Sequence, residues 1–167
     1  LSGAEFGGKK AAERAFNLQL SQLELDWPPL GFGSLGPLYR GTCAGSANVV
    51  VRRVRAIELR DTEYYAKEMA ILRRAKHPAL LTYMGAARLG HDVLVVCTYL
   101  PLGSLAAQLA SNARASVSGT QRLAIAGNIA SAMHYLHGHR RIHRHLSSRN
   151  VLVSNLTTGD VCISDFS

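Results

Sequence analysis

Three glycines, Gly31, Gly33 and Gly36, stand at the spacing G-x-G-x-x-G in the first quarter of the chain. Because glycine has no Cβ atom, backbone amides in such a segment can approach the phosphates of a nucleotide closely. The spacing alone is a weak signal, since it also occurs in ordinary turns. Pro37 follows directly, removes one amide and restrains the residue before it, so we expect a stiff loop.

Other segments with chemical groups follow the glycines along the chain, in this order: Val49-Val50-Val51-Arg52, Glu68, His143-Arg144-His145-Leu146-Ser147-Ser148-Arg149-Asn150, and Asp165-Phe166-Ser167. The set resembles the signatures of the protein kinase superfamily, G-x-G-x-x-G-x-V, V-A-I-K, a helical glutamate, H-R-D-L-x-x-x-N and D-F-G. Two departures change the chemistry, because Arg52 stands for the lysine and His145 for the catalytic aspartate. Partial matches in the expected order are hard to obtain by chance, so we interpret the chain as kinase-like.

Three stretches are similar to the tyrosine-kinase-like group, near Raf-like and mixed-lineage-like kinases: Trp27, residues 39–42 and residues 77–85. The resemblance covers residues 27–167. It implies an α+β, bilobal protein-kinase-like fold, with a five-stranded antiparallel sheet and one helix in the N-lobe, then the first part of a helical C-lobe. Since the chain starts without methionine and ends at D-F-S, before any activation segment, we expect a fragment.

The resemblance also implies a nucleotide site that uses ATP and Mg²⁺ as cofactors. Nucleotide contacts are expected at Gly31, Gly33, Gly36, Leu38, Val50, Thr98, Leu100 and Leu152. Cys97 would control the back of the adenine pocket. The metal ligands are expected to be Asn150 and Asp165, whose oxygens suit a hard cation. The catalytic positions are His145, where the base belongs, and Arg52 with its partner Glu68.

Two exchanges lead us to expect impaired catalysis. An imidazole at position 145 lacks the negative charge that orients a substrate hydroxyl, and loss of a general base typically costs about 10² to 10⁴ in rate. The guanidinium of Arg52 is planar and bulkier than an ammonium, so it can pair with Glu68 while reaching phosphates poorly. The primary hypothesis is therefore a pseudokinase that acts in signalling as a scaffold or allosteric partner.

Three alternatives stay open. The first is an active but unconventional protein serine/threonine or tyrosine kinase that transfers the ATP γ-phosphate to protein, since phosphoryl transfer depends mainly on positioning and charge. The second is a truncated or decayed gene product without a function of its own. The third is nucleic-acid binding, suggested by the net charge of +8 and the pI near 9.9. We do not expect it, because the cations are scattered and no aromatic residues interleave with them.

The interactions that we expect are with protein partners or a protein substrate, and kinase-type dimerisation is one form of them. Cys43, Cys97 and Cys162 are widely spaced, which predicts reduced thiols in a cytoplasmic protein. The longest apolar run, residues 93–102, is too short to span a bilayer. We therefore expect a soluble, intracellular chain without a membrane span.

Sheet and helix segments must position these groups. Residues 1–26 are interpreted as an N-terminal tail or linker with a helix at 9–25, and residues 27–98 as the N-lobe. N-lobe strands are expected at 30–33, 38–43, 48–54, 80–87 and 92–98, with a helix at 61–75 that carries Glu68. Residues 99–103 read as the hinge. The partial C-lobe, 104–167, is expected to contain helices at 104–109 and 120–137, with Gly138 as C-cap, and strands at 151–153 and 161–163.

Overall fold

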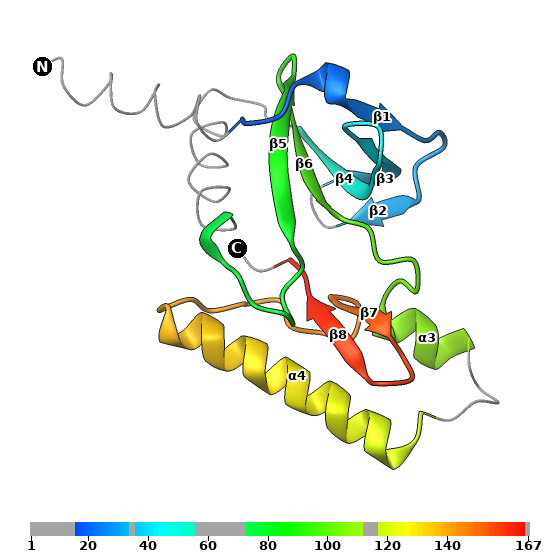
Figure 1. Ribbon diagram of the computed structural model, residues 1–167, viewed down its shortest axis with the longest axis vertical. Coiled ribbons are helices and arrows are strands. Elements are labelled where there is room, and N and C mark those ends of the chain that lie inside the picture. Colours follow the sequence, from blue (N-terminus) through cyan, green and yellow to red (C-terminus); the bar gives the residue numbers. More distant parts are fainter. Residues whose placement is uncertain (1–15, 34–35, 56–72, 112–116, 166–167) are drawn as a thin grey trace, which may run out of the picture. The chain divides into compact units, whose positions relative to one another are not determined.

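The chain divides into an antiparallel sheet unit and a helix-rich unit (Figure 1). The computed structural model describes residues 16–33, 36–55, 73–111 and 117–165. The described residues of unit 1 fall within Leu1–Arg74 and Thr82–Tyr99, and those of unit 2 within Ala75–Leu81 and Leu100–Ser167. The helix predicted at 61–75, including Glu68, lies almost entirely outside the described residues.

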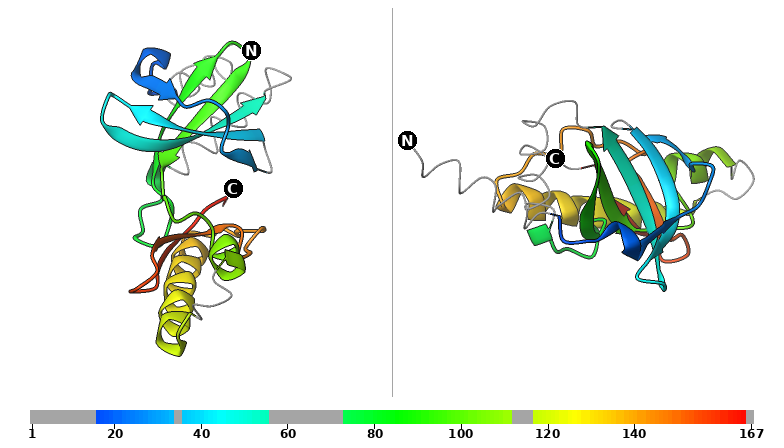
Figure 2. Two further views of the ribbon diagram at one scale, coloured as in Figure 1. Left: turned by 90° about the vertical axis from the view of Figure 1, so that its right-hand side faces the viewer. Right: turned by 90° about the horizontal axis from the view of Figure 1, so that it is seen from above.

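Unit 1 is built on a curled antiparallel sheet (Figure 2). Its strands are β1 (Leu23–Leu25), β2 (Gly31–Gly33), β3 (Gly36–Cys43), β4 (Ala47–Arg55), β5 (Tyr83–Leu89) and β6 (Asp92–Thr98). They are ordered β1-β3-β4-β6-β5, and β2 also pairs with β3. The strand predicted from the valine-rich run at 48–54 is confirmed as β4, which is central in this order because β-branched residues suit a strand covered on both faces.

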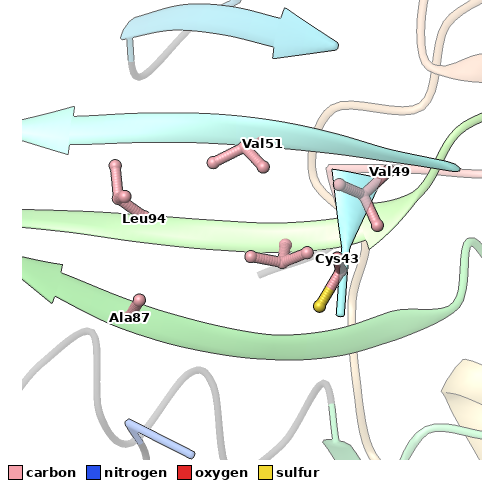
Figure 3. Packing of buried hydrophobic residues seen from close by; sticks show 6 residues of the cluster. Cys43, Val49, Val51, Ala87 and Leu94 are labelled. Atoms are coloured by element: carbon pink, nitrogen blue, oxygen red, sulfur yellow. The ribbon is translucent and has the colours of Figure 1, made fainter. Parts of the chain in front are cut away.

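The two faces of the sheet carry separate hydrophobic clusters. Val49 and Val51 of β4 lie on one face, where they pack with Cys43, Ala87, Leu94 and Val96 (Figure 3). Val54 packs on the other face with Ala86, Val93 and Val95. Because side chains alternate along a strand, Val50 and Arg52 belong to the face of Val54. This second face, the face of β4 residues 50, 52 and 54, therefore carries Val50 and Arg52 of the predicted site.

The segment before the glycines differs from the prediction. A helix was expected through residue 25, but Leu20–Gln22 form a 3-10 turn (η1) and Leu23–Leu25 form β1. The prediction of a helix is therefore wrong for residues 20–25. β1 gains its hydrogen bonds from β3, where Gly41 faces Leu25; a Cβ at Gly41 would collide with the Glu24 carbonyl. The sheet consequently has six strands rather than five. The strand expected from residue 80 begins at Tyr83, since Leu80 pairs with Ile163 instead.

Unit 2 combines two helices with a small hairpin. Its elements are α3 (Leu105–Ser111), α4 (Gly119–Gly138), β7 (Val151–Asn155) and β8 (Asp160–Ile163). Val151, Val153 and Val161 pack with Leu105, Val117 and Ile125, which fixes the hairpin against both helices. The antiparallel first unit and helical second unit agree with the expected α+β architecture. Among the described residues, no helix combines the length and apolar character that crossing a bilayer requires.

Neither end of α4 was predicted correctly from the sequence. Ser118 and Gln121 form a reciprocal capping box at the start of the helix. At the other end Gly138 was expected to be the C-cap, but the helix includes Gly138 and the C-cap is His139. The left-handed residue is Arg140, with φ of 56°. The N–H groups of His139, Arg140 and Arg141 all bond to carbonyls of the last helical turn, so this turn ends without help from glycine.

Candidate functional site

The glycine hairpin of unit 1 is formed by β2 and β3, with Gly31 opposite Leu38 and Gly33 opposite Gly36. Gly36 has φ of 138°, and a Cβ there would collide with the carbonyl oxygen of Arg53. A Cβ on Gly33 would make only ordinary contacts, and one on Gly31 would meet nothing within 4 Å. Packing within the described residues thus requires glycine at position 36 and leaves open space beside position 31, where a ligand could approach.

Alanine substitutions should separate these two roles. Gly36→Ala is expected to destabilise the protein by about 1–3 kcal/mol, because the new methyl group meets backbone that cannot move freely. Gly31→Ala should change the free energy of unfolding by less than about 1 kcal/mol, and any larger effect should fall on nucleotide affinity. Urea unfolding of both variants checks this prediction. Equal destabilisation by the two substitutions would contradict it.

Residues from three strands meet on the face of β4 residues 50, 52 and 54. Register places Leu38 opposite Arg52 and Val50 opposite Cys97. The Nε atom of Arg52 lies 3.8 Å from the position that a Cβ of Gly33 would occupy, so the arginine side chain runs close to the glycine hairpin. The structure thus brings Leu38, Val50 and Arg52 together on one face of the sheet. Glu68, the expected partner of Arg52, lies outside the described residues.

Cys97 and Tyr83 line the same face and are paired in the β5–β6 register. Burial raises the pKa of the Cys97 thiol to about 11, and the positive charge of Arg52 opposes that shift. Burial also raises the pKa of Tyr83, and its hydroxyl has no hydrogen-bond partner among the described residues. Both groups are therefore neutral at pH 7. Tyr83 was not predicted, because nothing in its sequence position distinguishes it from a core tyrosine.

Main-chain groups were predicted to contact adenine at Thr98 in unit 1 and at Leu100 in unit 2. The N–H of Thr98 is already used, since it donates to the Thr82 carbonyl at 3.0 Å. The Leu100 carbonyl accepts from the N–H of Gly103 at 3.1 Å. In the described part of the chain, the N–H of Leu100 has no acceptor. Of these amides, the one of Leu100 is the donor that a ligand could use.

His143 organises the predicted catalytic loop of unit 2. It is only 1% exposed, and its Nε2–H donates to the carbonyl of Ser164 at 2.9 Å. Its Nδ1 accepts from the backbone N–H of His145 at 3.2 Å, so one nitrogen donates while the other accepts. Only a neutral imidazole can do both. Burial lowers the pKa of His143, in agreement with this neutral form.

Asn150 closes the same loop. Its side-chain amide donates to the carbonyl of His145 at 2.7 Å, which leaves the amide oxygen available. Its own carbonyl accepts from the N–H and the hydroxyl of Ser164. Asp165 follows with φ of 61°, close enough to raise the pKa of His143 through its charge. The loop and the segment of Asp165 are therefore joined by direct hydrogen bonds, and the side chain of His145 is exposed.

The donor set of this region can be compared with what a metal ion requires. Asn150 and Asp165 offer oxygen atoms, but no group of three or more His, Cys, Asp or Glu side chains that could hold a metal occurs among the described residues. Mg²⁺ keeps several waters and commonly takes one or two carboxylates together with phosphate oxygens of a substrate. The residues present fit that mode of binding and do not fit an all-protein metal cage.

Leu152 also lies in unit 2, on β7. Its neighbours fix it, because Ser104 forms a bridge to Leu152 and the N–H of Val153 donates to the Gly103 carbonyl. Leu152 is half-buried, so part of its side chain can meet a ligand. The structure thus places Leu100, Leu152, His145, Asn150 and Asp165 in one unit. The role of each of these residues stays a prediction.

Comparisons with known proteins match the part of the chain in which the kinase-like motifs lie. The family described as protein tyrosine and serine/threonine kinase matches residues 27–167. The serine/threonine-protein kinase CTR1 of Arabidopsis thaliana is 31% identical over 161 residues, which cover 90% of this chain and 20% of that protein. The probable L-type lectin-domain containing receptor kinase V.3 of the same plant is 34% identical over 139 residues, or 78% of this chain and 21% of that protein. The tyrosine-protein kinase ABL2 of Mus musculus is 33% identical over 124 residues, or 74% of this chain and 10% of that protein. The chain thus spans between 10% and 21% of the length of these relatives.

Proposed function

Because the chain belongs to the protein tyrosine and serine/threonine kinase family, we propose that it is a pseudokinase region that binds Mg²⁺–ATP weakly and acts in signalling as a scaffold or allosteric partner. The fold is the α+β kinase fold, with the sheet of the N-lobe and the first part of a helical C-lobe. The proposal places the chain in the tyrosine-kinase-like group, near Raf-like and mixed-lineage-like kinases. CTR1 and ABL2, with one serine/threonine and one tyrosine kinase name, leave the acceptor residue open.

One observation carries the proposal: the catalytic loop is intact in its hydrogen bonds but not in its base. His143 and Asn150 hold the loop by contacts at 2.9 Å and 2.7 Å. His145, where the family has its catalytic aspartate, presents an exposed imidazole instead of a carboxylate. An imidazole has no fixed negative charge with which to orient a substrate hydroxyl. We infer a frame that is preserved for binding and impaired in proton acceptance.

Arg52 supports the same conclusion from unit 1. A guanidinium spreads its charge over a plane and hydrogen-bonds as a fork, whereas lysine brings a compact charge to the phosphates. The side chain of Arg52 is half-buried and runs beside the glycine hairpin, which supports a contact with phosphate. We infer that Arg52 retains attraction for phosphate and loses the geometry that lysine provides.

Several groups of this chain are suited to hold ATP and Mg²⁺. The open space at Gly31 admits phosphate, the N–H of Leu100 can donate to adenine, and Leu38, Val50 and Leu152 offer apolar contact. The oxygens of Asn150 and Asp165 would hold the cation. When bound, Mg²⁺–ATP supplies the γ-phosphoryl group with its charge partly neutralised. The residues of this chain then bind and orient, and the proton of a hydroxyl acceptor would have to pass to His145.

Nucleotide binding can be tested with Asp165→Asn in the full-length protein. The substitution removes a negative charge from the metal pair, so affinity for Mg²⁺–ATP should fall roughly tenfold to a hundredfold. Calorimetric titration with and without Mg²⁺ measures this. Asp160→Asn, an exposed carboxylate of the same unit, is the matched control and should bind like the parent. Binding that is equal in all three proteins would show that Asp165 holds no metal.

An active but unconventional kinase is the second candidate. It is favoured by the retained Asn150 and Asp165, because phosphoryl transfer depends more on positioning and charge than on a base. Transfer of phosphate from ATP to protein by the parent, lost in Asp165→Asn and retained in Asp160→Asn, would select this candidate. Absence of transfer together with measurable Mg²⁺–ATP binding would select the pseudokinase.

The remaining assignments are also proposals. Protein partners or a protein substrate, kinase-type dimerisation and a cytoplasmic location follow from the kinase-like interpretation. Within the chain we assign residues 27–98 to the N-lobe, 99–103 to the hinge and 104–167 to a partial C-lobe, preceded by an N-terminal tail or linker at 1–26. Retention of the sheet unit in proteins cut at the hinge would test these boundaries.

A further inference from the structure

The strand β5 contains a β-bulge at Met84. Tyr83 lies opposite Cys97 of β6. Gly85 lies opposite Val96, the preceding residue of β6. Because these two positions of β6 are consecutive, Met84 is an extra residue in β5. Such a bulge shifts the alternation of side chains along its strand by one position, and bulges are frequent next to active sites, where they redirect a side chain.

The bulge decides which face of the sheet Tyr83 occupies. Ala86 packs on the face of β4 residues 50, 52 and 54, and Ala87 packs on the opposite face (Figure 3). Strict alternation back from Ala86 would place position 83 on the face of Ala87. Tyr83 instead packs on the face of β4 residues 50, 52 and 54, and Met84 packs on the opposite one. The extra residue thus turns Tyr83 toward Cys97.

The side chain of Asn17 spans the bulge along the margin of β5. Its Nδ2 atom donates to the Met84 carbonyl at 3.5 Å, and its Oδ1 atom accepts from the N–H of Ala86 at 3.2 Å. The N–H of Leu18 donates to the Ala86 carbonyl at 3.1 Å. A Cβ on Gly85 would lie 2.6 Å from Oδ1 and 2.8 Å from Nδ2 of Asn17. The amide therefore occupies the space beside Gly85 and bonds the backbone on both sides of it.

The segment of residues 16–25 holds Asn17 in this place. Phe16 packs on the face of β4 residues 50, 52 and 54, whereas Leu18 packs on the opposite face, so the chain straddles the margin of β5 at Asn17. Farther along, β1 pairs with β3 at the other end of the strand order. Because Asn17 is held on both sides, its amide loses little further conformational freedom when it bonds β5.

We propose that Asn17 is a positioning residue for the nucleotide site: by holding the bulge of β5, it keeps Tyr83 beside Cys97 on the face of β4 residues 50, 52 and 54. The effect on nucleotide affinity rests on the function proposed above, whereas the placement of Tyr83 does not. Asn17 precedes the stretch that the kinase family matches, residues 27–167. A segment ahead of that stretch thus contributes to the geometry of the site.

The first readout does not depend on nucleotide. It is the rate at which iodoacetamide alkylates Cys97 in the full-length protein, followed by mass spectrometry of the peptide that contains it. Burial raises the pKa of the Cys97 thiol to about 11, so the parent should react slowly at about pH 8. Asn17→Ala should raise the rate about threefold to tenfold, because the strand that carries Tyr83 opens more often.

Leu94→Val is the matched control for this readout. It lowers the stability of the same unit through the buried cluster on the face opposite to Tyr83. Alkylation of Cys97 in this variant should stay within about twofold of the parent rate, because the bulge keeps its hydrogen bonds. Urea unfolding of each variant measures the stability that it loses, which separates a general loss of stability from a local change at the bulge.

The second readout is calorimetric titration of the full-length protein with Mg²⁺–ATP. Asn17→Ala should weaken binding about threefold to tenfold, and Leu94→Val should stay within about twofold of the parent. Gly85→Ala should weaken binding as Asn17→Ala does, because its new methyl group displaces the Asn17 amide. Gly85→Ala should add little when Asn17→Ala is already present, since the amide that it displaces is gone.

The outcomes separate this proposal from the function on which it rests. A parent without measurable Mg²⁺–ATP binding would refute the proposed function and the effect on affinity, and the alkylation rates would still decide whether Asn17 places Tyr83. Equal alkylation of Cys97 in Asn17→Ala and Leu94→Val would overturn the proposal, and so would additive effects of Gly85→Ala and Asn17→Ala. Faster alkylation with unchanged Mg²⁺–ATP affinity would overturn the role of Asn17 in the nucleotide site.

Discussion

Replacing Arg52 by lysine and His145 by aspartate together should raise phosphate transfer from ATP at least about a hundredfold in the full-length protein. Aspartate restores a negative charge that orients the acceptor hydroxyl and takes up its proton. Lysine restores a compact cation beside the glycine hairpin, where the Arg52 side chain now runs. The frame around His145 is already present, because Asn150 and His143 fix the loop backbone on each side of it.

The single variants separate the two contributions. His145→Asp alone and Arg52→Lys alone should each recover part of the rate, because the first restores the base and the second restores the positioning of the phosphates. Radiolabelled phosphate transfer to a generic protein substrate measures all three proteins. Arg55→Lys/His91→Asp makes the same exchanges at exposed positions of unit 1 and should stay at the parent rate. A parent already as fast as the double revertant would refute the pseudokinase proposal.

Replacing His143 by leucine should lower the free energy of unfolding by about 1–3 kcal/mol, since the buried carbonyl of Ser164 loses its hydrogen-bond partner. The backbone N–H of His145 loses the imidazole as an acceptor but keeps the carbonyl of residue 143, to which it donates at 2.8 Å. The catalytic loop and the segment before Asp165 would then be held mainly through Asn150. Urea unfolding measures the loss. His143→Gln, which keeps a donor and an acceptor, should lose less stability.

The same histidine predicts a pH dependence with a definite sign. Its pKa is lowered in the folded protein, so below about pH 6.5 the unfolded chain binds a proton that the folded chain does not. The stability that His143 contributes is therefore complete above this pH, and it is lost as the pH falls toward the folded pKa. Because His143→Gln cannot titrate, unfolding of this variant should vary less between about pH 5 and pH 8. Parallel curves for the two proteins would contradict the prediction.

Local patterns in the sequence were sufficient for most elements of the fold. The valine run predicted β4, and the helix expected at 120–137 is present as α4. β1 could not be predicted, because its hydrogen bonds come from β3, about 18 residues later in the chain. The end of α4 was misplaced because Gly138 suggested a C-cap. Instead Arg140 takes the left-handed conformation, which is less favourable for a residue with a Cβ atom than for glycine.

In the candidate site, too, local motifs could be recognised from the sequence, whereas contacts between distant residues could not. Motif spacing singled out the glycine hairpin, Arg52, Asn150 and Asp165, whose roles stay predictions. The structure places the hairpin and Arg52 in unit 1 and the other two residues in unit 2. The structural role of His143 depends on a bond to Ser164, 21 residues away, which no local pattern indicates. The isolated hydroxyl of Tyr83 was missed for a similar reason, since its surroundings are supplied by other strands.

The short strand β1 bears on where this protein can safely be shortened. The family match begins at residue 27, which invites an expression boundary there, yet β1 ends two residues earlier at Leu25. Such a cut would remove the strand that covers Gly41, Thr42 and Cys43 of β3. The N–H and carbonyl groups freed on that margin would offer a template to the same margin of another molecule. Self-association of a protein cut at residue 27 would then be an artefact of trimming and not a sign of regulated dimerisation.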